Sequence, residues 1–167
     1  MINQGQVEIP NCLPLDEEDS FAQNRTGVTV YKDASYITME LMKHGDFFSF
    51  IQKRNGLKHL ELTRYLFKQI CEGVKHIHNA GFCHLDLKID NILIGDDFNL
   101  KISDFGMAMP REVSLYQVKG TKTHIAPEIF EVERSHRHYK GIQADIYSLG
   151  VILFIIYFGN IPFNCAD

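Results

Sequence analysis

Four side chains that could serve phosphoryl transfer lie within 19 residues of one another: Asp86, Lys88, Asn91 and Asp104. Phosphoryl transfer asks little covalent chemistry of a protein. It needs a carboxylate to orient the attacking hydroxyl, a cation near the moving phosphoryl group, and oxygen ligands for magnesium. Two aspartates, a lysine and an asparagine supply groups of these kinds, so this stretch is the first candidate for a site.

Three short motifs place this stretch in a longer pattern. The letters HLDLKIDN occupy 84–91, Asp-Phe-Gly occupies 104–106, and Ala-Pro-Glu occupies 126–128. An Asp-Phe-Gly taken alone is more often a turn than a site. The motifs together, in this order and at this spacing, resemble the catalytic loop, the magnesium loop and the end of the activation segment of a protein kinase.

That resemblance implies a role for each polar residue. Asp86 would orient the proton of a substrate hydroxyl, and Lys88 would neutralise charge on the transferring phosphoryl group. Asn91 and Asp104 would hold magnesium. Thr121 would hydrogen-bond to Asp86 and Lys88. A lysine at 88 and a threonine at 121 resemble the serine/threonine kinases, and the stretch from 139 to 163 looks most like the calcium/calmodulin-dependent-kinase-like group.

The cofactors implied are ATP and magnesium, with the adenine held near residues 39–46. Met39 would guard the pocket, and Glu40 to Met42 would supply backbone contacts at the hinge. Asp46 would reach the ribose, and Leu93 would form the floor under the adenine. Read alone, Asp46 is better interpreted as the N-cap of the helix that follows it; in this order of motifs we favour the hinge.

The elements that must position these residues follow from the apolar pattern. Residues rich in β-branched and aromatic types predict strands, and apolar residues three and four apart predict helices. A polar turn at 95–99 between two apolar runs predicts a hairpin that brings Asn91 and Asp104 to the same end. The predicted strands and helices are 27–31, 36–41, 91–94, 100–103, 47–54 and 61–79.

The fold class implied is α+β and protein-kinase-like, mostly the helical large lobe with only the last strands of the small lobe. We expect a weakly ordered acidic segment over 1–26, small-lobe strands over 27–41, the hinge over 42–46 and the large lobe over 47–167. We also expect truncation at both ends. The glycine-rich phosphate loop, the strand lysine and the final large-lobe helices of the family have no match in this sequence.

Two features of the later chain concern packing. The apolar run Leu149 to Phe158 is too short to span a bilayer and predicts a buried core helix. Asp145, at the start of that helix, would accept hydrogen bonds from the backbone of the catalytic loop, because a buried carboxylate needs donors. His76 and His78 lie two residues apart and point to different helix faces, so we interpret both as surface or packing histidines.

The amino-acid composition also limits the class of protein and the kinds of partner that it can bind. The chain is 45% apolar and 23% charged, enough for a sizeable core. Its net charge of -4 gives no basic footprint for nucleic acid. Four cysteines without metal-like spacing indicate reduced thiols. We expect a cytoplasmic protein that binds ATP and a protein substrate, without nucleic acid or membrane.

Two readings of function remain open. The first is a serine/threonine protein kinase; the second is a catalytically impaired kinase-like scaffold or regulatory module. Asp46 and Asp90 would favour substrates that are basic around the target residue. Leu85 stands where many kinases carry an arginine that grips a phosphate on the activation segment, so phosphorylation of that segment is not expected to act by that route.

Overall fold

The computed structural model describes residues 22–23, 28–31, 34–135 and 137–163. The chain divides into two compact units, residues 1–41 and residues 42–167. Each unit is described by itself. The predicted catalytic and metal-binding residues all belong to the second unit, which also contains every described helix.

The first unit contains a small antiparallel sheet with the strand order β1-β2-β3. Its strands are β1 (Ala22–Gln23), β2 (Val28–Tyr31) and β3 (Ala34–Ile37). The predicted strand at 36–41 has the wrong bounds: Tyr31 pairs with Ala34, so β3 begins two residues earlier and ends at Ile37. The weakly ordered acidic segment expected over 1–26 lies outside the described residues except at β1, where Ala22 pairs with Val30, so that expectation stays a prediction.

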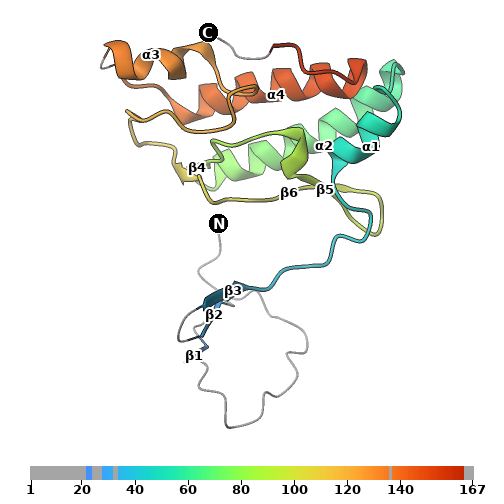
Figure 1. The fold of residues 1–167 in the computed structure, drawn as a ribbon, viewed down its shortest axis with the longest axis horizontal. Coiled ribbons are helices and arrows are strands. Elements are labelled where there is room, and N and C mark those ends of the chain that lie inside the picture. The colour runs from blue at the N-terminus through green and yellow to red at the C-terminus, as the bar shows by residue number, and fades with distance from the viewer. Residues whose placement is uncertain (1–21, 24–27, 32–33, 136, 164–167) are drawn as a thin grey trace. The chain divides into compact units, whose positions relative to one another are not determined.

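The second unit is built on four helices (Figure 1). The long helices α2 and α4 lie side by side, and a short 3-10 helix spans Ile89–Asn91. Asn79 ends α2 as predicted, and the left-handed Gly159 ends α4. The helices are α1 (Phe47–Lys53), α2 (Leu60–Asn79), α3 (Pro127–Ser135) and α4 (Gly141–Phe158).

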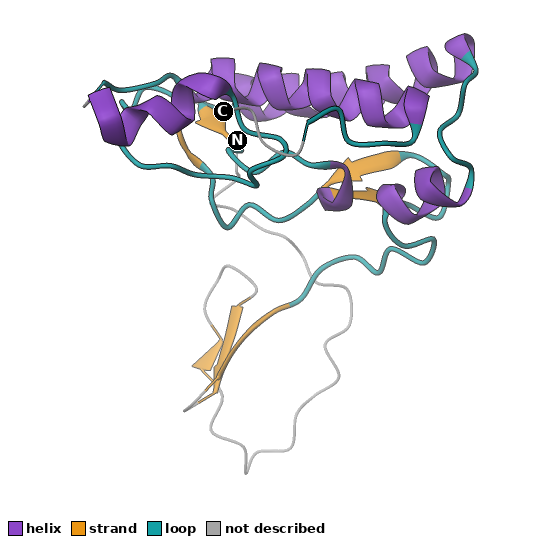
Figure 2. Cartoon of the chain, turned by 45° about the horizontal axis from the view of Figure 1, so that its top comes forward, coloured by secondary structure: helices purple, strands orange, loops and turns teal. Residues whose placement is uncertain are grey.

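Two short antiparallel pairs complete this unit (Figure 2). The predicted hairpin is confirmed: β5 (Ile92–Ile94) pairs with β6 (Leu100–Ile102). The second pair joins β4 (Phe82–Cys83) to β7 (Met109–Pro110). The two pairs carry the catalytic loop between β4 and β5 and the Asp-Phe-Gly motif between β6 and β7.

The main core lies between α1, α2, α4 and the β5–β6 hairpin. The apolar stripe of α2 supplies Ile70 and Val74, which are almost fully buried. Gly73 lets β6 approach closely, because a Cβ at this position would lie 2.9 Å from Ile102 Cδ1. The Gln69 side chain accepts a hydrogen bond from Leu100 N at 2.9 Å, which ties the hairpin to α2.

A second group of buried residues, called here the segment cluster, lies under the chain between β7 and α4. It combines residues from the catalytic loop, the predicted activation segment, α3 and α4. Met109 and Ile142 are among the partly buried residues that pack against it. The members of the segment cluster are Cys83, Leu85, Leu115, Ile125, Ala126, Ile129, Val132, Tyr139 and Ala144.

Helix α4 is buried on one side only, which corrects the expectation of burial all round. Leu153 and Phe154 are each 37% exposed, and Phe158 is 48% exposed. These side chains line a cavity of about 430 Å³ that also borders Leu60 and Thr63 of α2. By length and composition alone α4 could cross a membrane, but half of it is buried inside the protein, as in the core helix of a folded globule.

Candidate active site

The Asp86 carboxylate is the centre of a compact group of polar side chains. It is only 6% exposed. Its Oδ1 accepts the Thr121 hydroxyl at 2.8 Å, and its Oδ2 lies 3.1 Å from Lys88 Nζ. Lys88 Nζ also donates to Thr121 Oγ1 at 3.3 Å, so the predicted contacts of Thr121 with both residues are confirmed. The three groups hold one another in a fixed orientation.

His84 braces the loop that carries Asp86. The ring is fully buried; its Nδ1 accepts the N–H of Asp86 at 3.3 Å, and its Nε2 lies 3.0 Å from the Ser103 carbonyl. Because Nδ1 accepts, the ring carries its single proton on Nε2 and donates it to Ser103. The ring also packs on Phe105, with centroids 5.0 Å apart. His84 therefore links the catalytic loop to the Asp-Phe-Gly motif.

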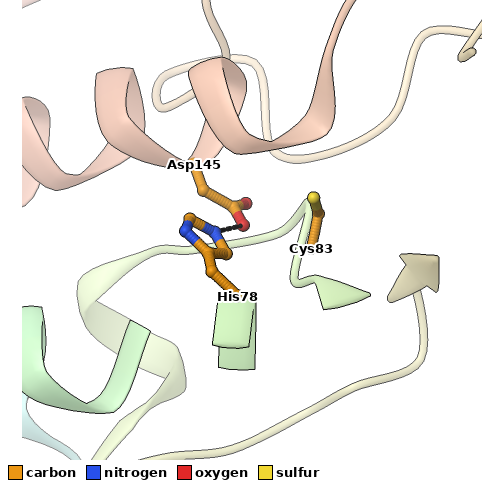
Figure 3. Close-up of side chains that lie close together, drawn as sticks. All are labelled: His78, Cys83 and Asp145. Atoms are coloured by element: carbon orange, nitrogen blue, oxygen red, sulfur yellow. Dashed lines mark hydrogen bonds and ion pairs between the residues drawn. The ribbon is translucent and has the colours of Figure 1, made fainter. Parts of the chain in front are cut away.

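Asp145 at the start of α4 holds the same loop, and its carboxylate also points toward the ring of His78 (Figure 3). Its Oδ2 accepts His84 N at 2.9 Å, and its Oδ1 accepts Leu85 N at 2.8 Å, which confirms the predicted contact with the loop backbone. The ring of His78 adds a third bond, 2.8 Å from Nε2 to Oδ2. No local pattern in the sequence points to this partner, because 67 residues separate it from Asp145.

Cys83 lies beside this pair, and its sulfur is within 4.8 Å of the nearest ligand atoms of His78 and Asp145. Burial, followed by the negative charge of Asp145, raises the pKa of the Cys83 thiol to about 12. Both carboxylate oxygens already accept backbone N–H groups. A metal ion would have to displace those bonds and ionise the thiol, so we interpret the group as structural.

The hairpin brings Asn91 and Asp104 together at one end, as predicted. Ser103, the neighbour of Asp104, donates from its N and its Oγ to the Asn91 carbonyl, at 2.8 and 2.9 Å. Asn91 Nδ2 donates to the Asp86 carbonyl at 3.0 Å, which turns the amide oxygen to the opposite side. Asp104 is exposed, with a left-handed φ of 62°. An amide oxygen and an exposed carboxylate are a donor set that fits Mg²⁺.

The segment before α1 lies along β5. Gly45 O accepts Ile94 N at 2.9 Å, and Asp46 forms an antiparallel bridge with the half-buried Leu93. The Asp46 carboxylate caps α1 by accepting Ser49 N at 2.7 Å and Ser49 Oγ at 2.8 Å. Partial burial alone would raise the pKa of Asp46, but these bonds outweigh it and lower the pKa. The alternative reading of Asp46 as a helix cap is therefore what the side chain shows.

The other predicted nucleotide contacts fall on both units. Met39 and Glu40 belong to the first unit and are exposed. Met42 belongs to the second unit, where it is half-buried and its carbonyl accepts Gly45 N at 3.1 Å. The contacts of these residues with an adenine ring stay predictions.

His124 is a buried histidine close to the site. It is 4% exposed, its Nδ1 lies 2.9 Å from Thr123 Oγ1, and its carbonyl accepts the Ser148 hydroxyl at 2.8 Å. Burial lowers the pKa of His124, although the charges of Asp90 and Asp86 act in the other direction. The ring is therefore uncharged near neutral pH.

Comparison with known proteins places the whole second unit in one family. The family model described as "Protein kinase domain" matches residues 20–167. That match covers all three motifs and all of the hydrogen-bonded groups described above.

Individual relatives agree with the match. CBL-interacting serine/threonine-protein kinase 7 of Arabidopsis thaliana is 37% identical over 162 residues, which are 95% of this chain and 34% of the relative. CBL-interacting serine/threonine-protein kinase 24 of the same plant is 41% identical over 135 residues, 79% of this chain and 29% of the relative. NUAK family SNF1-like kinase 1 of Homo sapiens is 36% identical over 138 residues, 81% of this chain and 20% of the relative. The chain spans about a third, or less, of the length of these relatives.

Proposed function

The chain belongs to the protein kinase domain family, among serine/threonine protein kinases, and on that premise we propose that it transfers the γ-phosphoryl group of ATP to serine or threonine hydroxyls of proteins. The observation that carries the proposal is the group Asp86, Lys88 and Thr121. A carboxylate and an ammonium group of the catalytic loop and a hydroxyl of the activation segment lie within 3.3 Å of one another.

The chemistry of this group follows from its geometry. Asp86 has lone pairs beyond those that Thr121 and Lys88 occupy, so it can accept the proton of an incoming hydroxyl. Lys88, whose side chain is 24% exposed, keeps an outward-facing charge that can stabilise the negative phosphoryl oxygens. Thr121 fixes the orientation of both.

Magnesium would be held by Asn91 and Asp104, and it would neutralise charge on the phosphates. The support is the oxygen donor set at the end of the hairpin. The nucleotide itself would lie against Met39, Glu40, Met42, Asp46 and Leu93. Asp46 can serve the ribose only with lone pairs that Ser49 leaves open.

We further propose that the substrate is a protein with basic residues around the target, and that the protein is cytoplasmic and binds neither nucleic acid nor membrane. The support for the substrate class is Asp90, an exposed carboxylate on the catalytic loop. Peptides with arginine ahead of the target should react faster than matched acidic peptides, and equal rates would remove this part of the proposal.

The test of the activity is transfer of labelled phosphate from ATP to a serine/threonine peptide by the purified chain. Asp86→Asn keeps the shape but weakens the proton acceptor, so the rate should fall by roughly 10²–10⁴-fold. The matched control is Glu72→Gln, an exposed acid on α2 that should leave the rate unchanged. Transfer that survives Asp86→Asn would contradict the mechanism.

The alternative function, a kinase-like scaffold with impaired catalysis, gives a different result in the same assay. It predicts binding of ATP with magnesium but no transfer above the Asp86→Asn background. Transfer above that background would contradict the alternative.

A further inference from the structure

We propose that Leu115 is an apolar anchor that holds residues 111–120 of the activation segment in place without phosphorylation. The anchor would keep Thr121 on Asp86. Its consequence for catalysis depends on the proposed kinase activity, but the anchoring itself is a property of the folded chain and can be measured separately.

The first observation is the burial of one side chain in an exposed stretch. Leu115 is only 5% exposed, whereas its neighbours Ser114 and Tyr116 are exposed, Tyr116 by 61%. The side chain joins the segment cluster under this part of the chain. A large apolar side chain that leaves water here stabilises the position of the backbone on either side of it.

The second observation is a backbone lock around the same residue. Leu115 and Tyr139 exchange two hydrogen bonds, Leu115 N to Tyr139 O at 3.4 Å and Tyr139 N to Leu115 O at 3.1 Å. The hydroxyl of the buried Tyr139 also donates to Gln117 O at 3.1 Å. Tyr139 therefore holds the segment at Leu115 and again two residues further on.

The third observation is the environment of Leu85. Its side chain is 5% exposed, belongs to the segment cluster with Leu115, and has Met109 packed nearby. Its backbone has a left-handed φ of 66° and is held by the bond to Asp145. Apolar side chains fill this site, so a phosphate brought here would lose its water to an apolar environment.

The anchor is connected to the catalytic group by a tight turn. Gly120 has a φ of +100°, and a Cβ there would lie 2.8 Å from Leu85 O and 2.5 Å from Ile125 Cγ2. The segment therefore returns directly over Leu85 before Thr121 donates to Asp86. Loss of the anchor five residues earlier should loosen this return path and the position of Thr121.

Hydrogen exchange of backbone amides in the full 167-residue chain tests the proposal. Leu115→Ala should speed exchange over 113–120 by at least roughly tenfold, because a buried leucine is replaced by a cavity. Leu115→Met, of similar volume, should keep the protection. Val113→Ala, at a neighbouring residue that is 39% exposed, should also leave it unchanged.

A second variant covers the case in which Leu115→Ala does not fold. Tyr139→Phe removes only the hydroxyl that donates to Gln117, so exchange near 117 should rise roughly fivefold. Exchange over α2 should stay as in the parent chain. Unchanged exchange rates over 113–120 in both variants would overturn the proposal. An equal rise in the exchange rates over α2 would overturn it as well.

Hydrogen exchange of the same 167-residue chain also tests whether the segment needs phosphorylation. Protection of 113–120 should be the same before and after phosphatase treatment, with mass spectrometry to confirm the phosphate content. Protection that appears only in phosphorylated protein would overturn the proposal. These results need no catalysis, so an inactive chain would count against the proposed function and not against the anchor.

Discussion

Asp145 is a buried carboxylate that holds the catalytic loop although it is not one of the proposed catalytic residues. It is 1% exposed and accepts bonds from His84 N, Leu85 N and the His78 ring. Bonds of this kind to a charged acceptor are the strong ones, and a buried donor without a partner is costly. The catalytic loop therefore takes its shape from a residue about 60 positions further along the chain.

Replacing that carboxylate should lower the free energy of unfolding. Asp145→Asn keeps the volume but offers one acceptor oxygen in place of two, so at least one buried N–H loses its partner. We expect a loss of about 2 kcal/mol or more in the free energy of unfolding, measured by urea titration. Glu72→Gln changes an exposed pair with Lys68 and should cost less than about 0.5 kcal/mol. Equal small costs would mean that Asp145 does not hold the loop.

His124 should make the free energy of unfolding depend on pH. Burial lowers its pKa in the folded state below the 6.5 of a free histidine, and Asp90, Asp86 and Lys88 are the charged groups that act on it. As pH falls below 6.5, the unfolded chain gains a proton that the folded chain does not. The free energy of unfolding should then decrease, until the folded-state pKa is reached.

The measurement is urea unfolding of the parent chain, His124→Phe and His76→Gln between pH 7.5 and 5. The first variant removes the buried titrating group, and its profile should be flatter below pH 6.5. His76 is exposed on α2, so its replacement should leave the slope unchanged. A His124→Phe profile as steep as that of the parent chain would contradict the assignment.

At the scale of elements, the close approach of the α1–α2 turn to the end of α4 depends on glycine. Gly159 has a φ of +80°, and a Cβ there would lie 2.4 Å from the backbone of Asn55 and Gly56. Gly81, which follows α2, has a φ of +90° with nothing within 4 Å of its Cβ position. The two residues share a backbone conformation and differ in the space around them.

Alanine at each position separates conformational strain from steric conflict. Gly81→Ala should cost only the left-handed strain, about 1–2 kcal/mol. Gly159→Ala must also move the turn at Asn55, so its loss in the free energy of unfolding should be larger by at least about 1 kcal/mol. Thermal or urea unfolding measures both, and equal losses would show that the turn yields easily.

The elements also show where sequence reasoning succeeds. Apolar residues three and four apart locate α2, and the turn letters at 95–99 locate the β5–β6 hairpin, because both signals are local. The bounds of β3 were not predicted correctly, because Ala34 and Ser35 enter the strand by pairing with Tyr31 and Val30, whatever their propensity.

Some residues of the candidate site could be predicted from the sequence, and others could not. The motifs identify Asp86, Lys88, Asn91, Asp104 and Thr121, and the structure brings the first three and Thr121 into one hydrogen-bonded group. His78 and Leu115 could not be found in this way. Their importance lies in contacts with Asp145 and with the segment cluster, which only the folded chain creates.

At the scale of the whole molecule, the second unit carries every predicted catalytic and metal-binding group. The family match extends over residues 20–167 and therefore includes residues of both units.

The measurement that tests the account most directly is the thermal unfolding midpoint with ATP and magnesium, for the parent chain and Asp104→Asn. Asparagine tolerates the left-handed backbone of this residue, so the variant removes charge without new strain. A ligand at about 100 times its Kd stabilises the folded state by about 2.7 kcal/mol, which is a rise of several degrees. We predict that rise in the parent chain, its dependence on magnesium, and its loss in Asp104→Asn but not in Glu72→Gln. No rise in the parent chain, or one that Asp104→Asn leaves intact, would contradict the proposed ATP and magnesium site.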